Sequence, residues 1–475
     1  MKQDILPAGR QVNFETYQSP FSWRYGSSEM RQIFSEINKR KTWRKVWVAL
    51  ARAQHKAGLI TSNELADIEK NAAKIDIQRS LEIEKEIYHD VMAEIKKFAS
   101  DAKIGGGKIH LGATSTDIDD NAEIIRIKEA LEIIENKIRV LLKNFAEKID
   151  KYQSLVCMGY THLQPAEPTT LGYRLAVYAQ DLLNDLKLIK RFNKEVKTKG
   201  IKGAVGTSAS YEKLLDENKF DSIWLSGQVM KDLGLDEATV SGQTYPRKTD
   251  YILLSYLASI AQSLHKFCFD LRIMQSPNFG EWSEPRGEKR VGSSAMPFKK
   301  NPDKAEKVCS LAKFVANLAP VAWNNAANSL LERTLDDSAS RRIIIPETFL
   351  AIDECLETTS KLVEGLVINE DNIKANLDKF GPFAATETLM MEAVKNGANR
   401  QNFHEIIRAI SMKAWNQINR GKINPLLNLL KSDKIITKFV QKEQIPKLIN
   451  PATHTGLSQK RCSLFLKELK KEVEI

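Results

Sequence analysis

Three long stretches of this sequence repeat apolar residues at alternating steps of four and three, and this feature restricts the possible fold more than any other. The repeated residues are Ile127, Leu131, Ile134, Ile138, Leu141 and Phe145; Leu175, Ala179, Leu182, Leu186 and Ile189; and Leu253, Leu257, Ile260, Leu264, Phe267, Leu271 and Met274. Such spacing is typical of helices that pack nearly parallel to one another. Helices of about 25 to 35 residues would form rods of roughly 40 to 50 Å. We therefore predict an all-α fold around a central bundle of long helices.

Rods of this length rarely bury their apolar sides within one subunit, so we expect copies of the chain to share the bundle. A monomeric bundle is the alternative. The chain has only 15 prolines and 23 glycines among 475 residues, and this scarcity of helix breakers also favours a helical fold. The length itself predicts more than one domain, because a single core rarely grows so large.

Changes in the pattern predict three domains: an N-terminal helical domain over 1–115, the long-helix domain over 116–368 and a C-terminal helical domain over 369–475. Ser27 or Ser28 is a candidate cap for the first helix, which Gly58 would end, and a second helical stretch is expected from about 75 to 99. The C-terminal helices are expected to be shorter, with breaks at Gly381–Pro382, Gly397, Asn424–Pro425 and Asn450–Pro451.

The formal net charge of +11 is compatible with a nucleic-acid partner or an anionic substrate. The lysines, however, are spread along helical segments, which is typical of a solvated surface. No RNA-binding signature, zinc-finger spacing or aromatic-basic interleaving is visible in the sequence. We therefore expect no nucleic-acid partner.

The cysteines are odd in number and far apart, which indicates a reducing compartment and no metal cluster. The N-terminal residues contain no apolar run of signal-peptide length, and we expect no membrane-spanning segment. A cytoplasmic protein is expected. Motifs for a nucleotide cofactor or catalytic metal, such as GxGxxG after a strand, a P-loop, HExxH or GxSxG, are absent, so we expect neither cofactor nor metal.

Unusual polar residues gather in segments next to the long helices, where chemistry is often placed. These segments are 108–121 (KIHLGATSTDIDDN), 159–170 (GYTHLQPAEPTT), 203–210 (GAVGTSAS), 241–250 (SGQTYPRKTD) and 290–306 (RVGSSAMPFKKNPDKAE). His89, His110 and His162 lie in such polar settings, and histidine transfers protons near neutral pH. Any one of the three could instead have only a structural role.

The segment Gly292–Asn301 offers complementary chemistry. Its backbone N–H groups near Gly292 and Ser293 could bind an anion, and Lys299 adds positive charge. These groups could stabilise a serine alkoxide, which would then serve as a base. A plain helix start with a serine cap is the alternative. A serine base, an anion site and a histidine acid together suit β-elimination next to a carboxylate.

The run GSSAMPFKKNP resembles the signature loop GSSxMPxKxNP of the fumarase/aspartase superfamily, and every specified position matches. Within that superfamily the chain is similar, over nearly its whole length, to the adenylosuccinate lyases, especially those of animals and some bacteria. The similar segments include SPFSWRYGSSEM, YHDVMAEI, GYTHLQPA and LERTLDDSASRR. The resemblance implies a three-domain homotetramer with active sites shared between subunits. It also implies release of fumarate from adenylosuccinate and from the succinyl-carboxamide ribotide SAICAR, without cofactor or metal.

The same resemblance implies the roles of individual residues. His162 would be the general acid and Ser293 the general base, and the other catalytic residues would be Lys299, His89 and His110. The substrate-binding residues would be Arg24, Tyr25, Tyr88, Asp90, Thr114, Ser115, Gln243, Ser294, Met296, Asn301, Lys307, Arg333, Ser338 and Arg342. Arg333, Ser338 and Arg342 would bind the nucleotide phosphate, because arginine side chains suit phosphate well.

Two positions depart from the animal-type pattern, which has arginine where this chain has Tyr88 and Lys307. Lysine keeps the charge but loses bidentate geometry, and tyrosine removes the charge. Two other functions stay open on the sequence alone. One is a lyase for argininosuccinate or another fumarate adduct, and the other is a non-catalytic protein, such as a nucleic-acid binder, on the same scaffold.

Overall fold

The computed structural model describes residues 15–287 and 291–473, which form two compact units. Unit 1 contains residues 15–138, 185–262 and 310–357, and unit 2 contains residues 139–184, 263–309 and 358–473. The three-domain division expected from the sequence stays a prediction.

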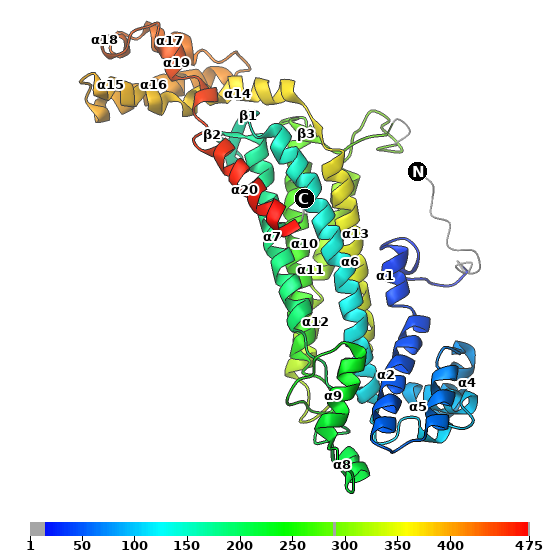
Figure 1. Ribbon diagram of the computed structural model, residues 1–475. Coiled ribbons are helices and arrows are strands. Elements are labelled where there is room, and N and C mark those ends of the chain that lie inside the picture. Colours follow the sequence, from blue (N-terminus) through cyan, green and yellow to red (C-terminus); the bar gives the residue numbers. More distant parts are fainter. Residues whose placement is uncertain (1–14, 288–290, 474–475) are drawn as a thin grey trace. The chain divides into compact units, whose positions relative to one another are not determined.

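Unit 1 contains a set of short N-terminal helices and parts of the long helices (Figure 1). Its complete elements are η1 (Pro20–Ser22), α1 (Ser28–Ile33), α2 (Glu36–Lys56), α3 (Ser62–Asn71), α4 (Ile77–Ile87), α5 (Asp90–Asp101), η2 (Gly106–Lys108), α8 (Ala209–Leu215), α9 (Ser222–Leu233) and α12 (Ala319–Ala327). The helices shared by the two units are α6 (Ser115–Tyr152), α7 (Leu171–Glu195), α10 (Lys248–Met274), α11 (Asp303–Ala316) and α13 (Asp336–Glu364).

Unit 2 adds four short strands and the C-terminal helices (Figure 1). Its strands are β1 (Val156–Thr161), β2 (Gln164–Thr170), β3 (Trp282–Ser283) and β4 (Val367–Ile368). Its complete helices are α14 (Glu370–Ala384), α15 (Thr386–Lys395), α16 (Arg400–Ile418), α17 (Leu426–Ser432), α18 (Ile436–Phe439), α19 (Ile445–Leu448), η3 (Pro451–Thr453) and α20 (Ser458–Val473).

The predicted long helices are confirmed. Helices α6, α7 and α10 have 38, 25 and 27 residues, and every residue of the three apolar repeats is buried. The all-α class is also confirmed, because the described strands form only two-stranded sheets. The repeats were readable in the sequence because a continuous buried stripe on a helix requires an apolar residue about every 3.6 positions.

The N-terminal helices begin and end differently from the expectation. Instead of one helix up to Gly58 there are two, because the side chain of Ser35 accepts a hydrogen bond from the N–H of Asn38 and starts α2 anew. Ser27 caps α1 as expected. The predicted stretch from about 75 to 99 is likewise broken, because Tyr88 adopts a left-handed conformation (φ 55°) that ends α4.

The core of unit 1 contains residues from α2, α5, α6 and α9. Trp43, Trp47 and Phe98 are among its largest fully buried side chains. Burying aromatic rings removes much apolar surface from water, so this cluster is a major source of stability in unit 1. The cluster packs α2 against the loop that follows η2 and against the first turns of α6.

In unit 2, strands β1 and β2 form an antiparallel hairpin in the segment expected to be a loop. Helix α14 packs on both strands, and a second apolar cluster joins α15 to α19 (Figure 1). Three expected breaks fall between helices, but α14 continues through Pro382 to Ala384. A proline near a helix end removes one hydrogen bond only, so the helix can continue for a few residues.

Helix α10 is, among the described residues, the one helix with the length and composition to cross a membrane, with a window of mean hydropathy 1.2. The expectation of no membrane-spanning segment stays a prediction. Half of the window is buried inside the protein, as in a core helix of a soluble protein. Length and composition alone therefore do not assign α10 to a membrane.

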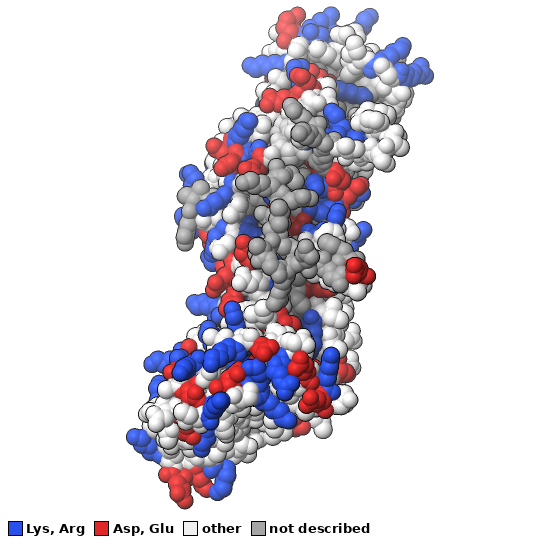
Figure 2. Space-filling view, turned by 90° about the vertical axis from the view of Figure 1, so that its right-hand side faces the viewer, with Lys and Arg blue, Asp and Glu red and all other residues white. Residues whose placement is uncertain are grey.

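Charges of both signs are mixed over the face drawn in Figure 2. Lysine and arginine side chains lie among aspartates and glutamates on that face, rather than in one continuous basic patch. Binding to nucleic-acid phosphates depends on concentrated positive charge. The absence of nucleic acid among the partners stays a prediction, and this face favours it.

Candidate active site

The predicted site residues fall into two groups, one in each unit. Unit 1 holds Arg24, Tyr25, Tyr88, His89, Asp90, His110, Thr114, Ser115, Gln243, Arg333, Ser338 and Arg342. Unit 2 holds His162, Ser293, Ser294, Met296, Lys299, Asn301 and Lys307.

His110 lies in a loop, with φ 68°, against the core of unit 1. The indole N–H of Trp47 donates to Nδ1 of His110 at 3.1 Å. Burial lowers the pKa of His110 to about 4, although the charge of Asp117 acts in the opposite direction. His110 is therefore neutral at neutral pH and can donate a hydrogen bond from Nε2. It does not carry the second proton that a histidine acting as a general acid would give away.

The break between α4 and α5 presents three predicted residues together. Tyr88 has 90% of its surface exposed, and His89 caps α5 by accepting the N–H of Met92 at Nδ1. Asp90 accepts a hydrogen bond from Arg342 at 2.7 Å. Burial would raise the pKa of Asp90, but the hydrogen bond and charge of Arg342 outweigh burial and hold that pKa below its usual value. The structure thus gives His89 a capping role, and its catalytic role stays a prediction.

Ser338 and Arg342, both on α13, line one small pocket of unit 1. The sequence analysis missed three further cations that line this pocket, Lys39 on α2, Arg126 on α6 and Arg341 on α13. Three carboxylates also line it, those of Glu36, Asp119 and Glu123. Burial lowers the pKa of the Lys39 ammonium, although the charges of Asp119 and Glu36 act in the opposite direction. Arg333 does not line this pocket, and its Nε donates to the carbonyl of Thr334.

The segment with Arg24 and Tyr25 is tied to α13 by backbone hydrogen bonds. The N–H of Gly26 donates to Glu354 at 3.1 Å, and the N–H of Ser27 donates to Asp353 at 2.6 Å. The guanidinium of Arg24 lies within 6 Å of two aromatic rings, 5.6 Å from the centre of Trp23 and 5.9 Å from that of Tyr25. The segment that carries Arg24 is therefore held against α13, the long helix that also carries Arg342.

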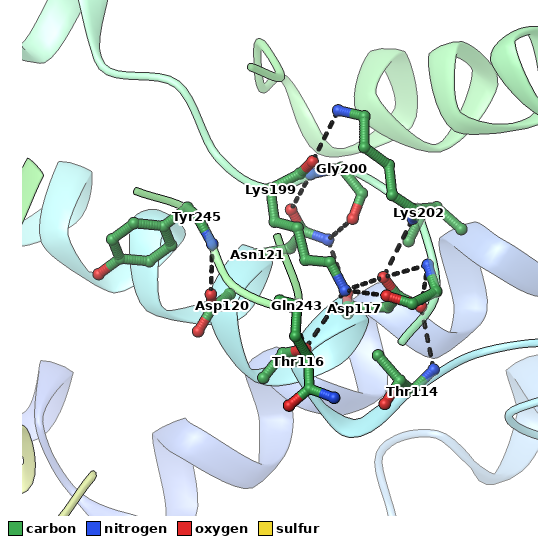
Figure 3. Close-up of polar contacts among 12 residues, drawn as sticks. Thr114, Thr116, Asp117, Asp120, Asn121, Lys199, Gly200, Lys202, Gln243 and Tyr245 are labelled. Atoms are coloured by element: carbon green, nitrogen blue, oxygen red, sulfur yellow. Dashed lines mark hydrogen bonds and ion pairs between the residues drawn. The ribbon is translucent and has the colours of Figure 1, made fainter. Parts of the chain in front are cut away.

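Thr114 and Gln243 are positioned through their backbones. The N–H of Thr114 donates to the carboxylate of Asp117 at 3.0 Å, at the start of α6 beside Ser115. The carbonyl of Gln243 accepts the hydroxyl of Thr116 at 2.5 Å, and its N–H donates to the carbonyl of Glu332 at 3.1 Å. Figure 3 shows these contacts around the first turns of α6. The sequence reading named Thr114, Ser115 and Gln243 but missed the groups that hold them.

His162 lies at the tip of the β1–β2 hairpin in unit 2. Thr161 pairs with Gln164, so the turn consists of His162 and Leu163, with φ 55° and 59°. Two positive φ values in a two-residue turn usually call for asparagine and glycine. Strained residues of this kind are common at functional sites. The imidazole of His162 is exposed, and among the described residues it has no hydrogen bond to Ser293.

Ser293 accepts two backbone hydrogen bonds at its hydroxyl oxygen Oγ, from the N–H of Ala295 at 3.3 Å and from the N–H of Met296 at 3.0 Å. The sequence analysis expected nearby amides to stabilise a serine alkoxide without naming them, and the structure identifies Ala295 and Met296 as the donors to Ser293. The loop turns back after Ser293 and thereby brings later amides onto its own hydroxyl. Two such donors would stabilise a serine alkoxide, because hydrogen bonds to a charged form favour that form.

The loop is closed on itself by side chains. Asn301 donates to the carbonyl of Gly292 at 2.8 Å, and Arg286 donates to the carbonyl of Lys299 at 3.1 Å. A Cβ at Gly292 would lie 2.2 Å from that same Lys299 carbonyl, so only glycine fits there. The sequence reading missed Arg286 because it lies outside the signature.

The remaining predicted residues of unit 2 surround this loop. Ser294, Met296 and Lys299 are exposed on it, and Lys307 lies, partly buried, on α11. The carboxylate of Glu284 accepts the N–H of Ala305 at 2.6 Å and thus holds the first turn of α11. The ammonium of Lys299 and the hydroxyl of Ser294 are exposed on the same loop, so both can reach an anionic substrate.

One group of side chains in unit 2 has donor types that bind metals. Ligand atoms of Glu167, Glu387 and His454 lie within 4.8 Å of one another. Both glutamates are exposed, and exposed acidic groups often gather without an ion. These residues are not among the predicted site residues, and their arrangement alone assigns no metal.

Two family models match the chain. The model described as Lyase matches residues 24–316, and the model described as Adenylosuccinate lyase C-terminus matches residues 382–463. The chain is similar to the adenylosuccinate lyase of Schistosoma mansoni, with 37% identity over 458 residues that cover 95% of each protein. It is also similar to that of Saccharomyces cerevisiae, with 36% identity over 462 residues that cover 96% of this chain and 95% of the relative. Similarity extends to archaea, because the adenylosuccinate lyase of Pyrococcus horikoshii is 37% identical over 440 residues (92% of this chain, 94% of the relative).

Solved structures resemble the fold. A fumarate lyase from Mesorhizobium sp. BNC1 has a TM-score of 0.83 at 23% identity, covering 95% of this chain and 99% of that chain. A 3-carboxy-cis,cis-muconate lactonizing enzyme from Pseudomonas putida has the same TM-score and coverage at 21% identity. At such low identity these structures indicate the fold alone.

Proposed function

The chain belongs to the lyase family and, within it, to the adenylosuccinate lyases, and from this membership we propose which residues carry out its reaction. Its activity is that of an adenylosuccinate lyase, the release of fumarate from adenylosuccinate with formation of AMP. We propose that it also cleaves SAICAR to AICAR and fumarate, because both substrates carry the same succinyl group on nitrogen and a ribose phosphate.

The proposed reaction is a β-elimination. The alkoxide of Ser293 removes a proton from the carbon next to a carboxylate of the succinyl group. The electron pair left on that carbon forms the double bond of fumarate as the bond between the neighbouring carbon and nitrogen breaks. His162 gives a proton to the leaving nitrogen, so the nucleotide departs as a neutral amine. Lys299 and Asn301 hold the carboxylates and stabilise the charge that develops on them.

The observation that carries this proposal is the pair of backbone N–H groups that point at Oγ of Ser293, at 3.0 and 3.3 Å. An ordinary serine hydroxyl is too weak an acid to serve as a base near neutral pH. Two fixed donors favour its alkoxide, and in this proposal the Lys299 ammonium of the same loop adds positive charge. The loop geometry therefore supports Ser293, rather than Ser294, as the base.

We propose that the nucleotide phosphate is bound in unit 1. Ser338 and Arg342 line a pocket together with Lys39, Arg126 and Arg341, which offers arginine side chains of the kind that bind phosphate. In this proposal the phosphate competes with Glu36, Asp119 and Glu123, which line the same pocket, for these cations. Arg24, Tyr25 and Arg333 supply further contacts in this proposal. Fumarate adducts without a phosphate, such as argininosuccinate, would make no use of these arginines as phosphate ligands, which disfavours the alternative function.

We propose that the protein acts as a homotetramer whose active sites take residues from several subunits. Large apolar side chains remain exposed on the long helices, which supports burial against further copies. They include Val140, Val177, Leu188, Phe269 and Ile343. Light scattering of the purified protein would test this assembly, and a monomeric mass at micromolar concentration would contradict it.

We also propose a cytoplasmic location. All five cysteines are free thiols and buried, which is typical of proteins kept in a reducing compartment. Cell fractionation with an antibody against the chain would test this location, and recovery in a secreted or organelle fraction would contradict it.

A substrate comparison tests the proposed function. Purified protein is mixed separately with adenylosuccinate, SAICAR and argininosuccinate, and fumarate is measured by its absorbance. We expect release from the first two and none from argininosuccinate. Fumarate from argininosuccinate alone would favour the related lyase. No fumarate from any of the three, with a folded protein, would favour a non-catalytic role.

A further inference from the structure

An ion pair buried at the start of α6 is not used by the proposed chemistry. The ammonium of Lys199 lies 2.7 Å from the carboxylate of Asp117, and both side chains have 0% of their surface exposed. Removing two charges from water costs several kcal/mol per ion unless further hydrogen bonds compensate. The surroundings of this pair supply such bonds, as Figure 3 shows.

The ammonium of Lys199 is fully satisfied. Its three N–H groups have three acceptors, the carboxylate of Asp117, the carbonyl of Gly203 at 2.8 Å and the hydroxyl oxygen of Thr116 at 3.2 Å. Because an ammonium only donates, the Thr116 hydroxyl must send its own proton elsewhere. It donates to the carbonyl of Gln243 at 2.5 Å. The ion pair is thus connected through one hydroxyl to a predicted substrate-binding residue.

The carboxylate of Asp117 gathers further segments. Besides Lys199 it accepts the N–H groups of Thr114 at 3.0 Å and Lys202 at 3.1 Å. It also accepts the N–H of Gly203 and the hydroxyl of Tyr211. Asp117 therefore ties the turn before α6, which carries two predicted substrate-binding residues, to the segment around Lys199.

A second side chain on the same face of α6 supports this arrangement. Asn121, one turn after Asp117, donates to the carbonyl of Gly200 and accepts the N–H of Gly200 at 3.1 Å. A Cβ at Gly200 would lie 1.7 Å from a carboxylate oxygen of Glu237 and displace that side chain, and the φ of +79° at this position also favours glycine. The path of the chain around Lys199 is therefore fixed from both sides.

We propose that Thr116, Asp117 and Lys199 are positioning residues for substrate binding. We name these three residues the α6 hub. The hub is too deeply buried to touch a substrate, but it fixes the backbones of Thr114 and Gln243 relative to each other. This proposal rests on the proposed function, in which Thr114 and Gln243 contact adenylosuccinate. If the proposal holds, the hub determines the affinity for substrate. The turnover of bound substrate depends much less on the hub.

Thr116→Val tests the hub with one small change. Valine keeps the shape of threonine but removes the hydroxyl that joins Lys199 to Gln243. We expect the KM for adenylosuccinate and the Kd for AMP to rise about tenfold, the effect of one buried hydrogen bond on an equilibrium. We expect kcat to stay within about threefold. Thr116→Ser keeps the hydroxyl and should restore both constants to within about twofold.

Thr348→Val is the matched control. Thr348 is also fully buried in unit 1, and its hydroxyl donates to the carbonyl of Ile344 on α13, away from the Gln243 loop. The Thr348→Val variant should lower the melting temperature about as much as Thr116→Val does, while leaving the KM for adenylosuccinate unchanged. Equal KM values for the two valine variants would overturn the hub proposal and leave a purely structural role. If Thr116→Val does not fold, Thr116→Ala removes the same hydroxyl without adding volume.

The two proposals fail in different ways. A wild-type protein that binds AMP in calorimetry but releases no fumarate would contradict the proposed function, and the AMP constants of the variants would still test the hub. A wild-type enzyme that cleaves adenylosuccinate, with Thr116→Val indistinguishable from Thr348→Val, would contradict the hub alone. A wild type that neither cleaves adenylosuccinate nor binds AMP would contradict both.

Discussion

The indole of Trp47 donates its N–H to Nδ1 of His110 at 3.1 Å, and this contact fixes the state of the histidine. An indole nitrogen only donates, so Nδ1 must be the acceptor and Nε2 carries the proton of the neutral ring. A second proton on Nδ1 would face the indole N–H directly. Geometry and burial therefore both favour neutral His110.

We expect the protein to lose stability as pH falls through the range between about 6.5 and about 4 because of His110. The native pKa is about 4, below the usual value of 6.5, so in this range the unfolded chain binds more protons than the native one. His110 thus contributes stability above that range and loses it as pH falls. Asp117 raises and His89 lowers this pKa, but burial has the largest effect.

His110→Asn measures this contribution. The asparagine oxygen can accept the Trp47 N–H, and asparagine tolerates the positive φ of this position. The difference in urea midpoint between about pH 7 and about pH 5 should be smaller in the variant than in the wild type. His404→Asn, on the exposed face of α16, is the control. An unchanged pH dependence in His110→Asn would show that His110 is not the group responsible.

Arg342→Ala should weaken substrate binding. The guanidinium is exposed enough to reach a ligand, is paired with Asp90, and lines the pocket proposed for the phosphate. Loss of a charged hydrogen bond predicts a rise in KM of about tenfold to about a hundredfold, similar for adenylosuccinate and SAICAR. Arg408→Ala removes an arginine from another exposed pair and should change neither KM. Equal kinetics of the two variants would remove Arg342 from the phosphate site.

The long helices could be predicted from the sequence because a buried helical stripe leaves a periodic record in consecutive residues. The break at Tyr88 could not be predicted, because nothing in the sequence marks a tyrosine that adopts the left-handed conformation. The neighbouring residues on both sides favour helix. The hairpin that carries His162 was also missed. Its strands are short and β2 contains Pro165 and Pro168, which ordinarily argue against a strand.

The candidate site was predictable where one continuous motif carries it, as in the loop of Ser293. The donors to its hydroxyl, the N–H groups of Ala295 and Met296, could not be named from the sequence, because the direction of an amide depends on how the loop turns back. The α6 hub was not predictable at all. Asp117 and Lys199 are far apart in the sequence, and charged residues are almost always exposed unless the fold pairs them.

Ser293→Ala should reduce kcat by about 10² to 10⁴, the usual range for a lost general base. The variant keeps the loop closed through Asn301 and Arg286, so the melting temperature should change little. Ser310→Ala, at an exposed serine of α11, should leave kcat unchanged. Turnover by Ser293→Ala near the wild-type rate would mean that another group removes the proton.

Mixing two inactive variants tests whether active sites are shared. In a mixed tetramer of Ser293→Ala and His162→Ala subunits, some sites would combine the intact loop of one subunit with the intact histidine of another. We therefore expect measurable recovery of activity after subunit exchange. Ser293→Ala mixed with Lys299→Ala should not recover, because both changes lie in the same loop and every site keeps one of them. Failure of the first mixture despite mass-spectrometric proof of exchange would contradict shared sites.

Leu163→Gly should stabilise the protein while harming catalysis. Leu163 has φ 59° and 59% of its surface exposed, so it carries strain and buries little. Relief of a left-handed conformation is worth about 1 to 2 kcal/mol, and the added freedom of glycine in the unfolded chain takes back about 0.5 to 1 kcal/mol. The net gain should lie between about 0 and about 1.5 kcal/mol, measured by chemical unfolding.

Leu464→Gly, at a leucine of α20 with 57% of its surface exposed, provides the opposite case. It places glycine inside a helix and should cost about 1 kcal/mol. For Leu163→Gly we expect kcat to fall even though stability rises, because a glycine beside His162 loosens the turn that aims the imidazole. A loss of stability in Leu163→Gly would show that the leucine side chain, and not backbone strain, determines this turn. A gain in stability with unchanged kcat would show that His162 needs no rigid turn to donate its proton.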